Sequence, residues 1–331
     1  MQGNYQTPEV KRRKIYVTVG VAGSGKSTWA QEQDNVKIFS SDQQRLKLFG
    51  ELAQHDNKRV FEILYDGLDL YRRNHSSKNV IVDATNLSRK KRIAFYQRFS
   101  KYGEVVIQYF VRSLEELRLH NEARPIEEQV PEHIIKKMYC SQEIPRLDVD
   151  CDRIQVEVSP ETREKLKKEY ILNEEVPHDS PYHSETIQAH IKSAVTASQN
   201  FPVKIDVFKY MLCQLAWYHD LGKFVAKSPA PKTPATEYFR SVNSGKCDRY
   251  IGHENISAMY FLSTLSRDSR DWSSRDAAVL EMIFQHMNAH RGFSEKMIDR
   301  HRLTPMELDL LEVFVLIDDM ATIPNTTILE Q

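Results

Sequence analysis

The chain has 331 residues, of which 40% are hydrophobic and 28% charged, and its 46 basic side chains balance its 46 acidic ones. This length favours two domains, and the composition is globular, with enough apolar residues for two cores. The zero net charge argues against a surface that is covered with nucleic acid throughout. No apolar run approaches the ~18 residues of a membrane span, and the four separated cysteines indicate free thiols. We therefore expect a cytoplasmic protein without a signal peptide or a membrane segment.

Strand-like and helix-like segments alternate along residues 1–158. The expected strands cover residues 14–20, 36–41, 79–84, 104–110 and 152–158, and the expected helices cover residues 42–50, 57–74, 88–101, 113–123 and 131–143. Strands that are separated by helices predict a parallel sheet with helices on both of its faces. We therefore expect an α/β domain over this part of the chain.

The character of the sequence changes after residue 158. Residues 159–175 are charged and are expected to form a linker that contains one short helix. Residues 227–250 are rich in Pro, Ser and Lys and are expected to form a long loop. Apolar residues recur at helical spacing in 186–199, 204–222, 253–266, 274–290 and 305–320, with no convincing strand. Residues 176–331 should therefore form an all-α domain.

Residues 20–28, with the sequence GVAGSGKST, match the phosphate-binding loop motif between a strand and a helix. Glycines in this loop let backbone amides approach phosphate oxygens, and the start of the helix adds partial positive charge. Lys26 is expected to reach the β and γ phosphates of ATP, and Ser27 is expected to ligate Mg²⁺. The residues predicted to bind the cofactor are Gly23, Ser24, Gly25, Lys26, Ser27 and Thr28.

Asp42 and Arg45 follow the second expected strand, at the edge of the sheet where the nucleotide should bind. A carboxylate there can accept the proton of an attacking hydroxyl group. Arg45, one helical turn on, can bind a phosphate of the acceptor. Taken alone, the same residues fit the capped start of a helix equally well.

Residues 86–101 contain six Lys and Arg and no acidic residue, with Phe95, Tyr96 and Phe99 among them. Basic side chains interleaved with aromatic ones are typical of single-strand binding. The other interpretation is a helix that buries its aromatic rings and exposes its charges. We favour this second interpretation for Phe95, Phe99 and most of the lysines.

Residues 14–145 resemble the kinase domain of bacteriophage-type 5′-polynucleotide kinases, the end-healing enzymes of nucleic-acid repair. The resemblance lies in GVAGSGKSTWA, in Asp42 with Arg45, and in DATNLSRKKR with the aromatic helix after it. It implies Asp42 as the general base, Arg45 as a clamp on the acceptor phosphate and Asp83 as a supporting carboxylate of the site that binds the acceptor strand. It also implies that Lys26 and Arg124, a lid residue, act on the ATP phosphates. Such enzymes carry a second basic lid residue where this chain has His120.

Eight of the twelve histidines lie between positions 178 and 301. Some of them form a regular series with two aspartates, at spacings of 29, 34, 33 and 32 residues: His190, His219 with Asp220, His253, His286 and Asp318. Each interval fits one helix and its connection, so successive helices of a bundle can each point one ligand to a common centre. Nitrogen and carboxylate ligands without thiolate suit Mn²⁺, Fe²⁺, Co²⁺, Ni²⁺ or Zn²⁺.

This series resembles the HD phosphohydrolase superfamily over residues 176–325, through AWYHDLGK, HENI and IDDMAT. The resemblance implies one metal bound by His190, His219, Asp220 and Asp318, with Asp220 at the centre of catalysis. His253 and His286 either bind a second metal or contact the substrate phosphate. The candidates to hold that phosphate are Lys223, Arg249 and Arg291.

Three assignments in the histidine series have a neighbouring alternative. His183 competes with His190, His290 with His286, and Asp319 with Asp318. For His178, His290 and His301 we favour a role other than metal ligand.

The two resemblances together predict a bifunctional end-healing enzyme, with residues 1–158 as the kinase domain, 159–175 as the linker and 176–331 as the HD domain. The first domain would phosphorylate 5′-OH ends of RNA or DNA from ATP. The second would remove a 2′,3′-cyclic phosphate or a 3′-phosphate with one or two metal ions. An RNA or DNA ligase is the expected functional partner, and a homodimer is among the oligomeric states left open.

Two other functions remain as alternatives. One is a small-molecule kinase, for a nucleoside or metabolite, fused to an HD nucleotidase, which the zero net charge favours slightly. The other is a regulatory protein in which ATP binding controls a hydrolase or a partner. Asp42 and Arg45 beside the phosphate-binding loop argue for catalysis over regulation alone.

Overall fold

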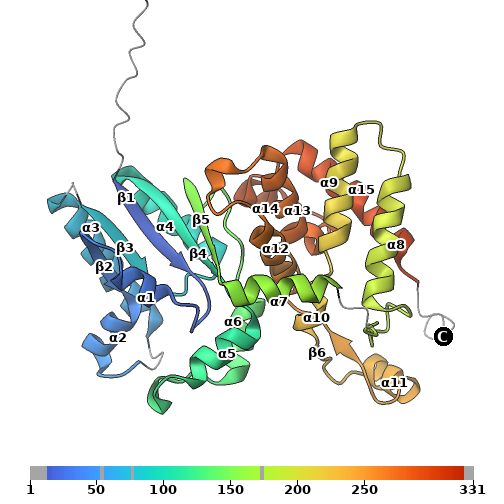
Figure 1. Ribbon diagram of the computed structural model, residues 1–331, viewed down its shortest axis with the longest axis horizontal. Coiled ribbons are helices and arrows are strands. Elements are labelled where there is room, and N and C mark those ends of the chain that lie inside the picture. The colour runs from blue at the N-terminus through green and yellow to red at the C-terminus, as the bar shows by residue number, and fades with distance from the viewer. Residues whose placement is uncertain (1–12, 53–55, 76–77, 172–174, 324–331) are drawn as a thin grey trace, which may run out of the picture.

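The computed structural model describes residues 13–52, 56–75, 78–171 and 175–323, which form an α/β half and a helical half side by side (Figure 1). The strands of the first half are β1 (Lys14–Val19), β2 (Val36–Ser40), β3 (Asn79–Asp83), β4 (Glu104–Val111) and β5 (Arg153–Val158). Its helices are α1 (Lys26–Gln31), α2 (Ser41–Phe49), α3 (Asn57–Asn74), α4 (Arg89–Phe99), α5 (Leu114–Glu122) and α6 (Glu132–Cys140), with 3₁₀ turns η1 (Ser100–Tyr102) and η2 (Ile126–Glu128).

The five strands form one parallel sheet in the order β2-β3-β1-β4-β5, which confirms the expected parallel sheet flanked by helices. Helices cover both faces, so the strands are continuous apolar runs, and Val80, Ile81 and Val82 of β3 are fully buried. In this order β1 lies between β3 and β4. A parallel sheet forms a crevice at the carboxyl ends of its strands at such a position. The loop after β1 and the ends of β2 and β3 therefore meet at one edge of the sheet.

The second half is helical, as expected. Its helices are α7 (Pro160–Ile171), α8 (Ile187–Asn200), α9 (Asp206–Tyr218), α10 (Lys223–Ala226), α11 (Pro234–Val242), α12 (His253–Thr264), α13 (Ser274–Ala289), α14 (Glu295–His301) and α15 (Pro305–Ala321), with the 3₁₀ turn η3 (Ser269–Asp271). Side-chain oxygens of Thr186, Ser273 and Thr304 cap α8, α13 and α15, which fixes where these helices begin. Most of α12 is buried on all sides, so α12 forms the centre of the bundle. None of the described helices has the length and apolar composition to cross a membrane.

Residues 227–250 are more ordered than the expected long loop. Two short strands, β6 (Ser228–Pro229) and β7 (Asp248–Arg249), pair in an antiparallel way, and α11 lies between them. Thr233 and Thr236 form a capping box with Pro234 at the first position of α11, which gives the helix a start in spite of its composition. The expectation of a loop was therefore wrong, and so was that of a second half without strands.

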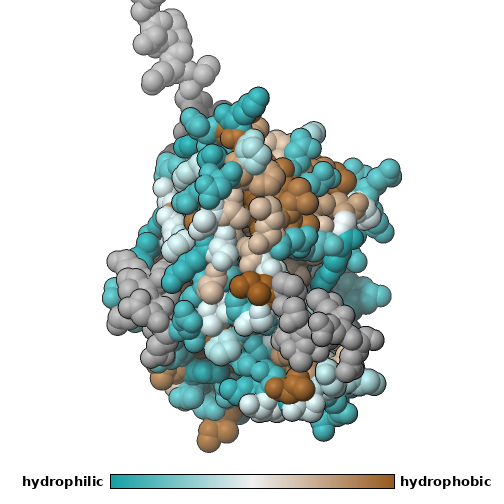
Figure 2. Space-filling model, turned by 90° about the vertical axis from the view of Figure 1, so that its right-hand side faces the viewer, coloured by the Kyte–Doolittle hydropathy of each residue, from teal (hydrophilic) through white to brown (hydrophobic). Residues whose placement is uncertain are grey.

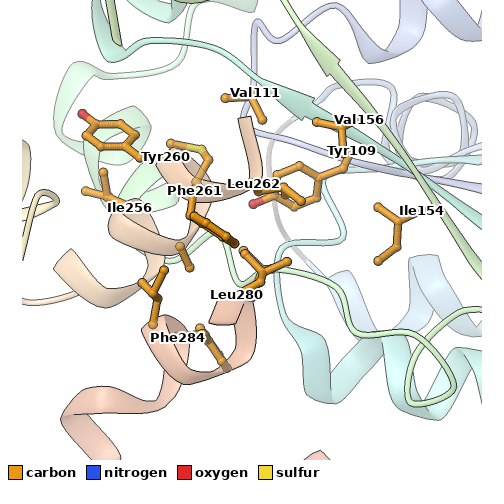
Figure 3. Packing of buried hydrophobic residues seen from close by; sticks show 14 of the residues in the cluster. Tyr109, Val111, Ile154, Val156, Ile256, Tyr260, Phe261, Leu262, Leu280 and Phe284 are labelled. Atoms are coloured by element: carbon orange, nitrogen blue, oxygen red, sulfur yellow. The ribbon is translucent and has the colours of Figure 1, made fainter. Parts of the chain in front are cut away.

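The two halves share one hydrophobic core. Tyr109, Val111 and Val156 of the sheet face Phe261 and the other labelled residues of α12 and α13 (Figure 3). The backbone of β5 also continues into the helical half, because Val156 N donates to Arg267 O at 2.7 Å. The relative position of the halves is therefore fixed by packing and by backbone hydrogen bonds.

Ion pairs add to this interface. Arg89 at the start of α4 is fully buried, and its Nη1 lies 2.8 Å from Glu281 Oε1 on α13. Arg146 pairs with Glu307 of α15 at 2.9 Å, and Arg153 pairs with Asp268. Removing one member of such a buried pair leaves the other charge uncompensated, so each pair fixes the register of the two halves.

The basic and aromatic segment around α4 is mainly structural. Phe95 and Phe99 are buried, while Lys90 and Lys91 are exposed, which confirms the interpretation favoured above. Arg92 is buried and bonds to Asp150 at 2.8 Å. Arg92, like Arg89, is therefore engaged within the protein.

Apolar side chains also gather outside the core, on the face where α8 and α15 lie (Figure 2). Leu316 and Met320 of α15 are 55% and 70% exposed there. A shallow cavity of about 550 Å³ between Ala197, Phe201 and Met320 lies beside them.

Candidate functional site

The phosphate-binding loop connects β1 to α1, as the motif requires. Gly25 adopts a φ of 90° as the N-cap of α1, a conformation that favours glycine. Lys26 Nζ donates to Val21 O at 2.7 Å and to Ser24 Oγ at 3.3 Å, so its ammonium group lies inside the loop. Ser27 Oγ donates to Asp83 Oδ2 at 2.9 Å, which joins the loop to the end of β3. The loop thus presents amides, an ammonium group and a hydroxyl–carboxylate pair at one place.

The pKa of Lys26 is lowered to about 8, mainly by burial; Asp83 and Asp42 oppose this shift, and the charges of Arg124 and Arg112 add to it. Keeping Lys26 protonated at neutral pH therefore costs on the order of 3 kcal/mol relative to the unfolded chain. A polyphosphate at the loop would offset this cost, because negative charge favours the protonated lysine. The electrostatics of the loop thus favour an anionic ligand.

Asp42 and Arg45 lie together on α2, next to the loop. Arg45 forms an ion pair with Asp42, and its Nη2 donates to Asn57 Oδ1 at 2.9 Å. The Arg45 side chain is 9% exposed and that of Asp42 63%, so the carboxylate faces solvent while the guanidinium is enclosed. Arg45 Nε is buried and has no hydrogen-bond partner among the described residues. The guanidinium group as a whole is the part of Arg45 that can bind a phosphate of the acceptor.

Both interpretations of this segment hold in part, because Ser40 accepts from Gln43 N and caps α2. The helix start and the Asp42–Arg45 pair therefore coexist. The cap orients α2, and the orientation of α2 places the pair at the edge of the sheet.

The segment from α5 to α6 covers the loop. His120 Nδ1 lies 2.9 Å from Gly23 O, so His120 makes the direct contact with the loop. Arg124 is half-buried and close enough to affect the pKa of Lys26. A cavity of about 940 Å³ opens beside the loop between α5 and α7, with Gly25, Arg112 and His120 among its walls. This volume falls within the range of small-molecule and cofactor sites.

Six side chains of the helical half converge in a second cluster, which we call the histidine–aspartate cluster. They come from five helices and the residues next to them: His190 of α8, His219 and Asp220 after α9, His253 of α12, His286 of α13 and Asp318 of α15. All but Asp318 are buried, with 0% to 4% exposure, and the Asp318 side chain is 13% exposed. The structure therefore brings together all six residues that the spacing singled out.

Four of these residues surround a first centre. His190 Nε2 lies 2.8 Å from Asp318 Oδ1 and 3.2 Å from His219 Nε2. Asp220 Oδ2 lies 3.4 Å from His219 Nε2 and 3.5 Å from His190 Nε2. Ligands at about 2.1 Å from one metal ion lie roughly 3.0 to 3.4 Å apart in tetrahedral or octahedral geometry. The observed distances fit such an arrangement.

Asp220 links this centre to a second one. Its other oxygen, Oδ1, lies 3.2 Å from His253 Nε2, which is 3.1 Å from His286 Nε2. Asp220, His253 and His286 thus form a group of their own with one carboxylate oxygen and two ring nitrogens. One carboxylate with an oxygen in each centre is the arrangement of a bridging ligand.

The tautomers of these histidines favour cations at both centres. Nδ1 of His219, His253 and His286 each lies 2.7 or 2.8 Å from a backbone carbonyl oxygen of its own chain segment. A carbonyl oxygen only accepts, so Nδ1 carries the hydrogen and the lone pair of the neutral ring is on Nε2. The lone pairs of His253 and His286 therefore face each other at 3.1 Å. A cation between them resolves the repulsion, so these residues fit a metal.

The charges of the cluster residues also favour cations at the two centres. Burial alone would lower the pKa of His219, but Asp220 and Asp318 raise it to about 10, so the carboxylates demand positive charge at the first centre. Burial and the neighbouring His253 lower the pKa of His286, which keeps its ring in the neutral form that binds metals.

Gly252 positions His253. It caps α12 with a φ of 82°, and a Cβ atom here would lie 2.1 Å from the carbonyl oxygen of Cys140 at the end of α6. Asn255 Nδ2 donates to the same oxygen at 2.8 Å. The start of α12, with its candidate metal ligand, is therefore seated on the α/β half.

The alternative residues lie around the cluster rather than within it. His183 contacts Glu185 at 2.8 Å, and Asp319 is exposed. His290 Nε2 lies 2.9 Å from Asp318 Oδ2, the oxygen that faces away from His190. The positions of His183 and His290 suit residues that orient ligands, and Asp319 has no hydrogen bond or ion pair to the cluster among the described residues.

Lys223 is the candidate phosphate contact that the structure brings to the cluster. Its Nζ lies 2.6 Å from Asp220 Oδ2 and 3.4 Å from His178 Nε2. Arg249 and Arg291 are exposed, and neither has a hydrogen bond or ion pair to the cluster among the described residues.

Glu185 was missed in the sequence because it lies in the loop before α8, outside the helical spacing. Its Oε1 lies 3.3 Å from Nδ1 of His190 and 2.8 Å from Nδ1 of His183. Burial alone would raise the pKa of Glu185, but the hydrogen bond with His183 and the nearby ring of His190 outweigh it and lower the pKa. The carboxylate therefore stays ionised and turns Nε2 of His190 toward the first centre.

We expect Glu185→Gln to weaken metal binding about 10- to 100-fold, because an amide holds the ligand His190 less firmly and supports its basicity less. Titration of the apo protein with Mn²⁺ in a calorimeter measures this change. The matched control is Glu175→Gln, an exposed glutamate in the same loop region. Equal affinity in the two variants would show that Glu185 does not orient the ligand.

A family model described as an AAA domain matches residues 15–145, which is less than half of the chain. Together with the parallel sheet and the loop after β1, this match makes the first half a P-loop kinase-like domain. The match ends before the helical half.

Two solved structures are similar to part of the chain. One, described as "Structure of the Pnkp1/Rnl/Hen1 RNA repair complex", is 26% identical and covers 40% of this chain and 44% of its own, with a TM-score of 0.36. The other, described as "Structure of Pnkp1/Rnl/Hen1 complex", is 26% identical and covers 36% of this chain and 41% of its own, with a TM-score of 0.31. This chain therefore spans less than half the length of either matched chain. No curated protein matches the chain.

Proposed function

We propose that the chain is a bifunctional enzyme that heals both ends of a broken nucleic-acid strand. One observation carries the proposal. A complete phosphate-binding loop with an acceptor pair occurs in the same chain as a buried cluster whose distances suit two bridged cations. A kinase site adds a phosphate group, and a two-metal site of this kind removes a phosphate group by hydrolysis. The two activities would cancel at a single position, so we assign them to different positions of one substrate.

In the kinase half, Asp42 would accept the proton of a 5′-OH group, because its carboxylate is exposed beside the loop. Arg45, which is paired with Asp42, would hold the phosphate of the acceptor strand through its guanidinium group. Lys26 and Arg124 would hold the ATP phosphates and stabilise the charge that develops on them. The lid residue His120 would close this side through its contact with Gly23.

Ser27 and Asp83 are the residues that would hold Mg²⁺. Their side chains are bonded at 2.9 Å, at the end of the loop, and a hydroxyl with a carboxylate suits this cation. This geometry favours Asp83 at the Mg²⁺ over Asp83 at the acceptor strand. When bound, the ion neutralises charge on the phosphates.

In the helical half, His190, His219 and Asp318 would hold one transition-metal ion, His253 and His286 a second, and Asp220 both. When bound, the ions lower the pKa of water and neutralise phosphoryl oxygens. Lys223, 2.6 Å from Asp220, would hold a further phosphoryl oxygen of the substrate. The substrates proposed are a 2′,3′-cyclic phosphate or a 3′-phosphate at the end of a strand.

The products of both sites are the ends that a ligase joins. An RNA or DNA ligase is therefore the functional partner that we propose. The class of the substrate is a polynucleotide end because Arg45 provides for a phosphate on the acceptor, which a nucleoside lacks.

A single strand with a 5′-OH and a 2′,3′-cyclic phosphate, labelled separately at each end, tests the proposal. With ATP, Mg²⁺ and a series of transition metals, we expect the 5′ end to gain a phosphate and the 3′ end to lose its cyclic phosphate. A parallel reaction with nucleosides and mononucleotides tests the small-molecule alternative. Reaction of the small molecules alone, with neither strand end changed under any metal, would overturn end healing in favour of that alternative.

A further inference from the structure

Residues 227–251, which we call the arm, leave and re-enter the helical half next to the histidine–aspartate cluster. The chain enters the arm shortly after Lys223, which contacts Asp220, and leaves it just before the ligand candidate His253. Figure 1 shows α11 at the end of this arm, away from the body of the molecule. The arm is therefore attached to the cluster at both of its ends.

The root of the arm is fixed by Asp179. Lys227 Nζ donates to Asp179 Oδ2 at 2.8 Å, Asn243 Nδ2 donates to Asp179 Oδ1 at 3.2 Å, and Asp248 N donates to Asp179 O at 2.7 Å. The hydroxyl of Tyr250 donates to the carbonyl oxygen of the adjacent His178. His178 in turn contacts Lys223. The arm is thus a rigid extension of the cluster's rim rather than an independent loop.

The exposed surface of the arm is basic and aromatic. The arm contains five basic residues against two acidic ones: Lys227, Lys232, Arg240, Lys246 and Arg249 against Glu237 and Asp248. Lys232 and Lys246 are exposed and have no ion-pair partner within 4.0 Å in the part of the chain that the structure describes. The Tyr238 ring, 37% exposed, lies between them in the sequence. Phe239, next to it, is buried and anchors α11.

We propose that the arm binds the single-stranded nucleic acid that leads into the cluster, through its phosphates at Lys232 and Lys246 and through a base stacked on Tyr238. The inference rests on the proposed function, since it concerns the strand whose 3′ end the cluster would process. Unpaired lysines and an exposed aromatic residue on one short segment are the elements that single-strand binding uses. The net charge of the whole chain is zero, so the positive charge on the arm is local and complements a polyanion at this place.

The arm explains how one cluster can serve a strand rather than a nucleotide. A mononucleotide fills only the cluster itself and Lys223. A nucleic-acid strand extends beyond the histidine–aspartate cluster. The arm begins and ends next to this cluster, so it lies where such a strand can continue. The contribution of the arm should therefore appear for long substrates and not for short ones.

The test compares a single-stranded oligonucleotide that ends in a 2′,3′-cyclic phosphate with adenosine 2′,3′-cyclic phosphate. The arm variant of the full chain combines Lys232→Ala, Tyr238→Ala and Lys246→Ala, which are outside the cluster. We expect the KM for the oligonucleotide to rise about tenfold or more, with a salt dependence of binding that falls by about 1.4 in slope for the two lost charges. Hydrolysis of the mononucleotide should stay within about twofold of the wild type, since the arm does not reach it.

The matched control combines Lys204→Ala, Lys209→Ala and Tyr210→Ala. These residues are also two lysines and a tyrosine, but they follow α8, which carries the chain about 15 Å away from His190. They should leave both substrates unaffected. Equal KM values for the oligonucleotide in wild type and arm variant would overturn the arm proposal while the proposed function stands. Absence of hydrolysis of both substrates by the wild type would instead overturn the function and the arm proposal with it.

Discussion

Asp220→Ala is expected to abolish the removal of a 2′,3′-cyclic phosphate or 3′-phosphate while 5′ phosphorylation continues. Asp220 has one oxygen near each centre, 3.4 Å from His219 and 3.2 Å from His253, so its loss affects both proposed metal ions. Metal ions supply several kcal/mol of transition-state stabilisation, so we expect a fall of about a thousandfold or more. Release of 3′ phosphate measures the first activity, and transfer of γ-phosphate to a 5′-OH oligonucleotide measures the second.

The control for this variant is Asp319→Ala. Asp319 is the exposed neighbour of Asp318, so the substitution removes a carboxylate close to the cluster but outside it. We expect no more than a twofold change in either activity. Metal content after dialysis should fall in the Asp220 variant and not in the control. Persistence of 3′-end hydrolysis in Asp220→Ala would refute the proposed metal site.

Asp42→Ala is expected to have the opposite pattern, with 5′ phosphorylation lost and 3′-end hydrolysis intact. Its carboxylate is the exposed member of the pair with Arg45, at the end of β2 and beside the loop that contains Lys26. A general base contributes about 10² to 10⁴ in rate, so kcat should fall by that factor. Because Lys26 and the loop remain, the affinity for ATP should stay within a few-fold of the wild type. Steady-state kinetics with varied ATP separate the two parameters.

Asp34→Ala serves as the matched control because it lies directly before β2 while Asp42 follows β2. The two aspartates therefore lie at opposite ends of β2, and only Asp42 lies at the end where the phosphate-binding loop is. Lys26→Ala should resemble Asp42→Ala in its loss of kinase activity but should also weaken ATP binding. An unchanged kcat in Asp42→Ala would assign the proton acceptor to another group.

The sequence allowed much of both candidate sites to be anticipated, for physical reasons. Phosphate-binding loops use a fixed spacing of glycine and lysine, so residues 20–28 could be placed between a strand and a helix without further information. The histidine series could be recognised because five helices of the bundle each bring one or two side chains to the cluster, which produces intervals of similar length.

Other features depend on contacts that leave no local pattern. Arg89 lies in a basic segment that resembles a nucleic-acid surface, yet it is buried against Glu281, which is 192 residues away in the chain. Glu185 lies outside the helical spacing, and only the folded structure shows that it lies 3.3 Å from His190. The bridging position of Asp220 depends on where its two oxygens lie, which requires three helix ends to be placed in space. The arm shows a different failure, because the local Thr-Pro-Ala-Thr signal for α11 was outweighed by the Pro, Ser and Lys content around it.

The contact between Gly252 and the carbonyl oxygen of Cys140 has a consequence for how such a chain can change during evolution. The helix α12 brings His253 to the cluster, but α12 begins on the end of α6, which belongs to the α/β half. A recombination that replaced residues 14–145 with a different P-loop domain would keep all six residues of the cluster and lose the support under one of them. The helical half is therefore not an independent module, and we expect a change at the end of α6 to require a matching change at the start of α12.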